Sequence, residues 1–532
     1  MFLSLLYPDE ESAARGARRE GTPHIDERVC AELGLDKLLP LRGCSLSSFF
    51  TADPAVIAYR QEIFDDMRRL PALGEVLGDA IPVLFDILEL RRMDEDLGAG
   101  GTESYLYSIT EIELYVSCID SLARGLAPLS DKVKSRGFSA LCDRIRELSE
   151  SDYYRELNQG LSQLSSRIRE VKSITVGVNL DARLRPASAG VVSVNAEPFK
   201  SGELLDKILR MSFRNDSFTC IAQLLPYDKS QPENRRDAMT HAFHGALSDV
   251  FRSSVRGWRR IVGEYVLENT DFLLKILPEI EFVTCAASLL SSLEKRGCAL
   301  ALPQLRPMGE KAFTAEALYN ADVALRIEDE IVPNDFSFDD HGRLYILTGP
   351  NRGGKSVITC AVGQAQALVQ LGLYAPAKSL VLSPVDGIFT HFPEGAEDTI
   401  DKGRLGEECA RLREIFDGIS EHSLVLLDES LSSTGAYEAS YIAAEILCGF
   451  GVARLRGIFS THLHELAARL DEINDRIAAE GGVRVDTLVA GIEEGKRSFR
   501  VYRRKPDGKS YARDIADKYG LSFESLKKSL QQ

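Results

Sequence analysis

The chain has 532 residues, of which 44% are hydrophobic and 27% are charged, and its formal net charge at pH 7 is -16. This length exceeds one ordinary hydrophobic core, so the sequence predicts a globular protein of two or more domains. The acidic balance argues against a surface covered with phosphate-binding Lys and Arg, and the lack of a signal peptide or an apolar run of spanning length predicts a cytoplasmic protein without a membrane partner.

Helical periodicity dominates the first half of the chain after a leading segment of residues 1–52. From about Asp53 to Glu170, apolar residues recur three and four positions apart, as in PAVIAYRQEIFDDMRRL and ALCDRIRELSE. The same periodicity returns from about Arg235 to Lys295. These patterns predict a helical region over residues 53–307.

A β-rich insertion is predicted to interrupt this helical region at about residues 173–225. Between Ser173 and Asn195, apolar and polar residues alternate and Gly and Pro bracket the run, which indicates strands. The stretch from Ser173 to Arg260 carries 13 Lys and Arg against 9 Asp and Glu, and residues 496–513 carry 8 against 1. Such basic stretches are typical of surfaces that meet a polyanion, although solvated charge explains each of them equally well.

The stretch GPNRGGKS, from Gly349 to Ser356, has the glycine-rich pattern of a loop that binds a phosphate. An apolar strand pattern precedes it and a run of helix formers follows it, so the first N–H groups and the positive end of a helix would face the phosphate. Lys355 is predicted to reach the β- and γ-phosphates, and Ser356 to bind Mg²⁺. The predicted nucleotide-binding residues are Gly349, Pro350, Asn351, Arg352, Gly353, Gly354, Lys355 and Ser356.

The stretch SLVLLDES, from Ser423 to Ser430, places an acidic pair directly after a buried strand pattern. In open α/β sheets, ligands bind at the carboxyl ends of the strands. We expect Asp428 to bind Mg²⁺ and Glu429 to polarise the attacking water, which is the division of roles that phosphoryl transfer to water requires. An acidic pair at the end of a strand can also serve only to keep the protein soluble. Its position after the phosphate loop favours the catalytic interpretation.

A third strand end follows in GIFSTHLHEL, from Gly457 to Leu466. A neutral histidine at such a position can hydrogen-bond a γ-phosphate, which makes His462 a candidate catalytic residue beside Glu429. The alternative interpretation is a histidine that begins a helix. The order of loop lysine, acidic pair and strand-end histidine is that of ATPases that close as sandwich dimers.

Five motifs in this order resemble the ATPase domain of the MutS family of DNA mismatch-repair proteins: GPNRGGKS, GIFTHF, LVLLDESLSSTG, FSTHLHEL and GKSYARDIADKYGLS. The resemblance extends over roughly Val332 to Ser522. It implies an α/β P-loop ATPase domain of the ABC and MutS type in residues 308–532, with ATP and Mg²⁺ as cofactors. In the helical region, residues 53–307, it implies lever helices with a clamp inserted between them.

The resemblance also implies a homodimer through the ATPase domains, in which a signature loop of one subunit completes the nucleotide site of the other. It places Ser433 and Thr434 opposite the partner's nucleotide. Where mismatch-repair members carry a Ser-Thr pair in the signature loop, this chain has glycine and arginine. Backbone N–H groups of this loop and the arginine side chain would bind the partner's phosphates; the alternative is that these are solvated loop residues. The expected in-trans residues are Gly403, Arg404, Leu405, Gly406 and Glu407.

The mismatch reader of the family is a separate leading domain, whereas about fifty residues precede the helical region here. We therefore expect a MutS-like ATPase without that reader. It would hydrolyse ATP and close as a dimeric clamp on structured or branched DNA rather than on simple mismatches. Two alternatives keep part of this interpretation, namely an ATPase that remodels a nucleoprotein such as a ribosome, and a binding module switched by its nucleotide.

Overall fold

The computed structural model describes most of the chain, and its residues group into two compact units. The first unit comprises Met1–Gly74, Lys134–Phe138 and Pro278–Gln532, and the second comprises Glu75–Val133 and Ser139–Leu277. No helix in the described ranges is both long and apolar enough to cross a membrane. The described residues are 2–96, 103–152, 154–159, 161, 173–180, 182–183, 186–195, 197, 200–201, 219–220, 271–350, 353–392, 404–493, 496–505, 520–521 and 523–530.

Long helices and a β-hairpin make up the described part of the second unit. The hairpin pairs β1 (Ser173–Leu180) with β2 (Pro186–Asn195) in antiparallel register, which confirms the strands predicted there. Of the helical stretch predicted from about Arg235 to Lys295, residues 235–270 lie outside the described residues, and the rest forms a helix as predicted. The long helices are α5 (Pro71–Asp96), α6 (Glu103–Leu126) and α7 (Arg136–Glu150), and the short paired strands are β3 (Lys200–Ser201) and β4 (Thr219–Cys220). Helix α12 (Asp271–Lys295) begins in the second unit and belongs to the first unit from Pro278 onward.

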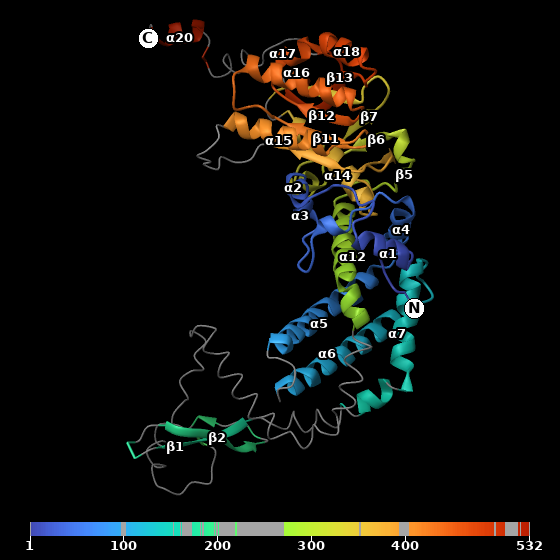
Figure 1. Ribbon diagram of the computed structural model, residues 1–532, viewed down its shortest axis with the longest axis vertical. Coiled ribbons are helices and arrows are strands. Elements are labelled where there is room, and N and C mark those ends of the chain that lie inside the picture. The colour runs from blue at the N-terminus through green and yellow to red at the C-terminus, as the bar shows by residue number, and fades with distance from the viewer. Residues whose placement is uncertain are drawn as a thin grey trace. The chain divides into compact units, whose positions relative to one another are not determined.

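A six-stranded sheet forms the centre of the first unit, in the order β10-β11-β12-β8-β13-β14 (Figure 1). Neighbouring strands run parallel except for the antiparallel pair β13 and β14. Every residue of β8, β11 and β12 is buried, as is usual for parallel strands covered on both faces. The strands are β8 (Leu344–Thr348), β10 (Ile388–His391), β11 (Leu424–Asp428), β12 (Arg456–Ser460), β13 (Val485–Glu493) and β14 (Lys496–Arg503).

Helices pack against this sheet and complete its core. Apolar residues of four of them, among them Leu412, Leu447 and Ile473, form one cluster with Val425 and Leu427 of β11. Helix α14 contacts β11 and β12 and is buried along nearly its whole length. The helices are α14 (Lys355–Gln370), α15 (Arg404–Gly418), α16 (Ala436–Val452), α17 (His464–Ala468) and α18 (Leu470–Ala479). The mixed helix and sheet architecture predicted for this part of the chain is therefore present.

A second, four-stranded sheet in the order β5-β9-β6-β7 belongs to the same unit. Its aromatic side chains join the two sheets, because the rings of Phe336 and Phe338 each lie 5.7 Å from the ring of Tyr345 in β8. Aromatic contacts at this separation contribute beyond the area that they bury. The strands are β5 (Gln304–Leu305), β6 (Phe313–Leu318), β7 (Asn334–Phe338) and β9 (Ser379–Leu382).

The N-terminal segment also belongs to the first unit. An aspartate caps three of its helices, because Asp9, Asp26 and Asp53 each accept a hydrogen bond from a backbone N–H in the first turn. His24 pairs with the edge of the large sheet: its N–H donates to the carbonyl of Asp386 at 2.7 Å. The helices are α1 (Glu10–Ala17), α2 (Glu27–Glu32), α3 (Leu35–Leu38) and α4 (Pro54–Arg69); the other short elements of this unit are η1 (Leu46–Ser48), η3 (Met308–Glu310), α13 (Ala321–Arg326) and α20 (Phe523–Leu530).

Candidate nucleotide site

The predicted phosphate loop joins β8 to α14. Gly349 has a φ of +144°, and a Cβ atom at this position would lie 2.7 Å from the Cβ of Ala490. Gly354, with a φ of +95°, directly precedes the helix. Both positions need glycine, and the backbone they form brings N–H groups to the positive end of α14, where an anion is stabilised. Asn351 and Arg352 lie outside the described residues.

The amine of Lys355 lies inside this loop, and its side chain is only 3% exposed. Nζ donates to the carbonyl oxygens of Gly349 and Pro350, both at 3.3 Å. It also lies 3.3 Å from Nε2 of His462. Burial lowers the pKa of the Lys355 amine, and two nearby carboxylates oppose this effect. A phosphate that enters the loop would therefore meet a partly desolvated cation, for which it is a stronger partner than the loop carbonyls.

Asp428 ends β11 and carries the carboxylate predicted to bind Mg²⁺. It is 4% exposed, and its Oδ1 has no hydrogen-bond partner among the described residues. Burial raises the pKa of this carboxyl group, while the hydroxyl groups of Ser356 and Ser460 act in the opposite direction.

This pair of oxygen groups fits a magnesium ion. Mg²⁺ in nucleotide sites is held by one or two protein oxygens, with phosphate oxygens and water completing its shell. Ser356 and the buried carboxylate of Asp428 supply such oxygens beside the phosphate loop. The described part of the chain contains no cluster of three His, Cys, Asp or Glu residues that suits a metal. Ser356 and Asp428 would leave the other positions of such a shell to phosphate oxygens and water.

Glu429 follows Asp428 with a φ of +48°, in the left-handed region. Its backbone N–H donates to the carbonyl of Ser460 at 2.8 Å, and its Oε1 lies 2.6 Å from Nε2 of His462. Non-glycine residues at positive φ carry local strain and cluster at functional sites. The ring of His462 thus lies within hydrogen-bonding distance of both the Glu429 carboxylate and the Lys355 amine. The predicted lysine, acidic pair and histidine lie together at the carboxyl ends of adjacent strands.

The predicted in-trans residues lie at the start of α15. This helix begins at position 404, so its first turn contains Leu405, Gly406 and Glu407. The preceding residues 393–403 lie outside the described residues, as does the side chain of Arg404. Arg, Leu and Glu are good helix formers and an acidic residue near a helix N-terminus is favourable, which supports helix from position 404 despite Gly406. The contribution of these residues to a partner's site stays a prediction.

A second histidine lies beside the acidic pair, although the sequence indicated no role for it. His391 ends β10 and is 5% exposed, and its Nδ1 lies 2.8 Å from Oγ of Ser430. Leu431, the next residue, has a φ of +65°. The contact therefore anchors the unusual backbone directly after Glu429. Its sequence signal is a histidine at the carboxyl end of a strand, in GIFTHF, next to the strand that carries the acidic pair.

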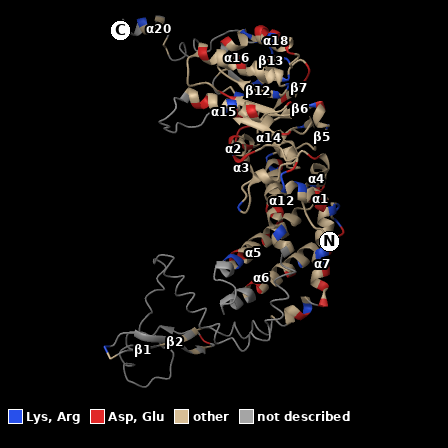
Figure 2. Ribbon diagram, viewed as in Figure 1, with Lys and Arg blue, Asp and Glu red and all other residues tan. Residues whose placement is uncertain are grey.

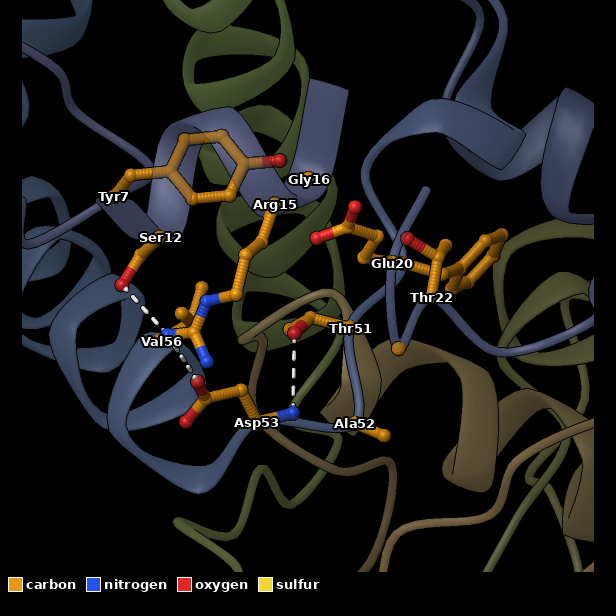
Figure 3. A pocket seen from close by; sticks show the side chains of 12 residues that line it. Tyr7, Ser12, Arg15, Gly16, Glu20, Thr22, Thr51, Ala52, Asp53 and Val56 are labelled. Carbon is orange, nitrogen blue, oxygen red and sulfur yellow. Dashed lines mark hydrogen bonds and ion pairs between the residues drawn. The ribbon is translucent and has the colours of Figure 1, made fainter. Parts of the chain in front are cut away.

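A pocket of about 290 Å³ lies elsewhere in the first unit, between the N-terminal segment and the start of α4 (Figure 3). Two of its charged groups pair with each other: Nη2 of Arg15 lies 3.4 Å from Oδ2 of Asp53 and also donates to Oγ of Ser12 at 3.3 Å. None of the residues that line it belongs to the phosphate loop or to the acidic pair. The nucleotide site is therefore separate from this pocket.

Two family models match the chain on either side of residue 300. One is described as MutS domain V and matches residues 345–509; the other is described as the MutS2 N-terminal domain and matches residues 52–296. The chain belongs to the MutS family. Domain V is the ATPase region of this family, and the match contains Lys355, Asp428, Glu429 and His462. The resemblance predicted from the motifs is confirmed.

Individual MutS proteins align with part of the chain. It is 33% identical over 201 residues to DNA mismatch repair protein MutS 1 of Haloarcula marismortui, which covers 36% of this chain and 21% of that protein. It is 29% identical over 267 residues to DNA mismatch repair protein MutS of Chlorobium chlorochromatii, covering 48% and 30%. It is 28% identical over 202 residues to Endonuclease MutS2 of Thermus thermophilus, covering 38% and 26%. The chain thus spans less than a third of the length of these relatives.

Proposed function

We propose that this MutS-family chain is an ATP-hydrolysing, DNA-binding protein that closes as a dimeric clamp on structured or branched DNA. The observation that carries the proposal is the arrangement of Lys355, Asp428, Glu429 and His462 around one glycine loop, within a match to MutS domain V. A cation, two carboxylates and an imidazole are the groups that ATP hydrolysis requires. Lys355, Glu429 and His462 contact one another, and Asp428 is buried.

The geometry supports a division of labour among these residues. Lys355 and the first N–H groups of α14 would bind the phosphates. Mg²⁺ held by Ser356 and Asp428 would neutralise charge on the β- and γ-phosphates. Glu429 would accept a hydrogen bond from the attacking water, and before a nucleotide binds the 2.6 Å contact with His462 holds its carboxylate at the site.

His462 has a second proposed task. Its ring lies 3.3 Å from Nζ of Lys355, the group expected to bind the γ-phosphate. A γ-phosphate bound by the lysine would therefore lie within reach of the histidine, which could exchange its bond to Glu429 for one to the phosphate. Such an exchange would report the presence of ATP and free the Glu429 carboxylate for water.

The helical region, residues 53–307, would supply the proposed clamp. We keep the division into a leading segment (1–52), a helical lever region with a clamp-like insertion (53–307) and an ATPase domain (308–532) as part of the proposal. Support comes from the match of residues 52–296 to the MutS2 N-terminal domain and from the β1–β2 hairpin, which is framed by helical segments along the chain. Two such units in a dimer would enclose a nucleic acid when the ATPase domains close.

The acidic net charge supports the second candidate function, an ATPase that acts on a nucleoprotein. Figure 2 shows Lys and Arg interspersed with Asp and Glu along the described helices. With a net charge of -16, the chain has less phosphate-binding capacity than most proteins that coat DNA. A ribosome or another particle with protein and RNA surfaces would need fewer phosphate contacts.

One experiment separates these functions. ATP turnover of the purified chain is measured alone and with matched, mismatched, branched and single-stranded DNA, and with ribosomes, at several salt concentrations. The proposal expects stimulation by branched DNA that falls steeply with salt, because phosphate contacts release counterions. Stimulation by ribosomes alone would favour the nucleoprotein function, and nucleotide binding without turnover would favour a nucleotide-switched binding module.

A further inference from the structure

The N-terminal segment contacts two other helices of the first unit at once, through the last residue of α2 and the residue that follows it. Glu32, the last residue of α2, forms an ion pair with Arg411 of α15. Leu33, the next residue, accepts a hydrogen bond at its carbonyl oxygen from Nε2 of Gln364 in α14, at 2.9 Å. Helix α14 carries the phosphate lysine, and α15 begins at the predicted in-trans residues.

The contact with α14 is closely packed. A Cβ atom at Gly363 would lie 2.5 Å from Cδ2 of Leu33 and 2.7 Å from Cδ1 of Leu426, so glycine at this position lets the N-terminal segment approach the helix. Sγ of Cys360 lies 3.4 Å from the carbonyl oxygen of Leu33. The Gln364 side chain is fully buried and accepts a second bond from the N–H of Ala321 at 2.8 Å. Leu33 is thus fixed relative to the helix that holds Lys355.

The contact with α15 is polar and shielded from water. The side chains of Arg411 and Glu32 are 13% and 10% exposed. Nη2 of Arg411 also donates to the carbonyl oxygen of Thr390 in β10 at 3.0 Å. On its apolar side, α15 packs through Leu412 and Ile415 into the core of the sheet. The pair with Glu32 therefore adds a directional contact to a helix that apolar packing holds less specifically.

We propose that the Glu32–Arg411 ion pair positions α15 for its task in the composite ATPase site, which makes the N-terminal segment a working part of the ATPase. The inference rests on the proposed function, because α15 begins at the residues expected to complete the partner's site. Position 404 lies seven residues, or about two helical turns, before Arg411. A small rotation or shift of α15 at Arg411 would move its first turn relative to the partner's nucleotide, and displacements on the order of 1 Å are enough to lower catalytic rates strongly.

The test measures ATP turnover and nucleotide affinity for Glu32→Gln, Arg411→Gln and the double variant of the full chain. We expect each single variant to lower kcat about tenfold, while the dissociation constant for a fluorescent ATP analogue changes less than twofold. Glu32→Gln also removes the pair that Glu32 forms within α2 with Nε of Arg28, at 3.4 Å. The double variant should still be no slower than the slower single variant, because both changes remove the same contact between α2 and α15. Glu32→Asp, which keeps the charge, should recover most of the lost activity.

Two matched controls lie on the same helices. Arg413→Gln removes an arginine of α15 whose side chain is 70% exposed, and Glu27→Gln removes an exposed acidic residue of α2. Both should leave kcat within twofold of the unmodified chain. All rates are divided by the concentration of nucleotide-binding sites, so a variant that merely folds less well loses sites and keeps its kcat.

A second measurement separates the inference from the function on which it rests. In the Glu429→Gln background, ATP should produce a tighter dimer by sedimentation, and adding Glu32→Gln should weaken it. An ATP-dependent dimer and a kcat that are both insensitive to the pair would overturn the positioning proposal and leave the proposed function standing. Additive effects of the two single changes would overturn it as well. A parent chain without turnover and without an ATP-dependent dimer would overturn both.

Discussion

At the residue scale, the end of β11 holds two carboxylates in different surroundings. Asp428 is buried beside two serine hydroxyls, whereas the Glu429 side chain is 37% exposed and contacts His462. A buried carboxylate with an unsatisfied oxygen suits a cation, and an exposed carboxylate with an orienting partner suits a water molecule. The two neighbouring residues are therefore expected to fail in different ways when each is changed.

Glu429→Gln should leave nucleotide binding intact and slow hydrolysis by a factor on the order of 10² or more, because the water loses its acceptor while the magnesium ligands survive. Single-turnover hydrolysis and a binding titration measure the two effects separately. Lys355→Ala should instead weaken binding itself. The matched control is Glu480→Gln, which changes an exposed glutamate directly after α18. It should change neither the hydrolysis rate nor the nucleotide affinity. Unchanged turnover in Glu429→Gln would remove the catalytic assignment.

Asp428→Asn should stabilise the nucleotide-free chain while removing the extra stability that MgATP gives. Burial raises the pKa of Asp428, so the folded protein carries this charge at a cost that asparagine avoids. We expect the Tm to rise by a few degrees at neutral pH, measured by calorimetry with and without MgATP. Asp475→Asn, at an exposed position of α18, is the control and should leave both values unchanged.

The pH dependence of the stability gain from Asp428→Asn shows whether the buried charge or the packing causes it. A carboxyl group whose pKa is higher in the folded state costs stability only where it is ionised. The gain from Asp428→Asn should therefore vanish at low pH, where Asp428 is protonated, and should grow as the pH rises above the ordinary value of 3.8. A gain that is constant with pH would point to packing rather than to the buried charge.

At the element scale, the phosphate loop depends on the backbone freedom of Gly349. Gly349→Ala would place a Cβ atom 2.7 Å from the Cβ of Ala490 in β13, at a φ of +144° that L residues rarely adopt. We expect nucleotide affinity to fall at least tenfold, since a shifted loop no longer directs its N–H groups at the phosphate. Gly309→Ala, where a new Cβ atom meets nothing within 4 Å, is the control. Equal affinities of the two variants would contradict the assignment of the loop.

Sequence patterns could predict the elements of this site because its signals are local. The glycine loop lies between a strand and a helix, and Asp428 and His462 each follow an apolar strand pattern. The attachment of the N-terminal segment was not predictable in this way. Gln364 and Gln370 of α14 are counted as polar helix formers from sequence alone, yet both are fully buried. Each donates to a backbone carbonyl of the N-terminal segment more than 300 residues away along the chain, and no local pattern encodes such a contact.

At the scale of the whole molecule, the proposed site in one chain comprises the glycine loop, the carboxylate of Asp428 for a cation and the carboxylate of Glu429 for the water. The proposed in-trans contribution must come from a second copy. A ligand that spans an interface stabilises that interface, just as any ligand favours the state that it binds. Oligomeric state in the presence of trapped ATP is therefore the direct readout of a composite site.

We predict that ATP shifts the Glu429→Gln chain from a monomer or loose dimer to a tighter dimer. Arg404→Ala should weaken that shift without abolishing nucleotide binding, because Lys355 and the loop backbone belong to the same chain as the bound nucleotide. If Arg404 is instead a solvated residue at the start of α15, its removal will change nothing. Sedimentation of Glu429→Gln and of its Arg404→Ala double variant, each with and without ATP, decides between these outcomes. Four identical profiles would contradict the composite site, whereas an ATP-dependent dimer that is weakened with Arg404→Ala would place this arginine at the partner's nucleotide.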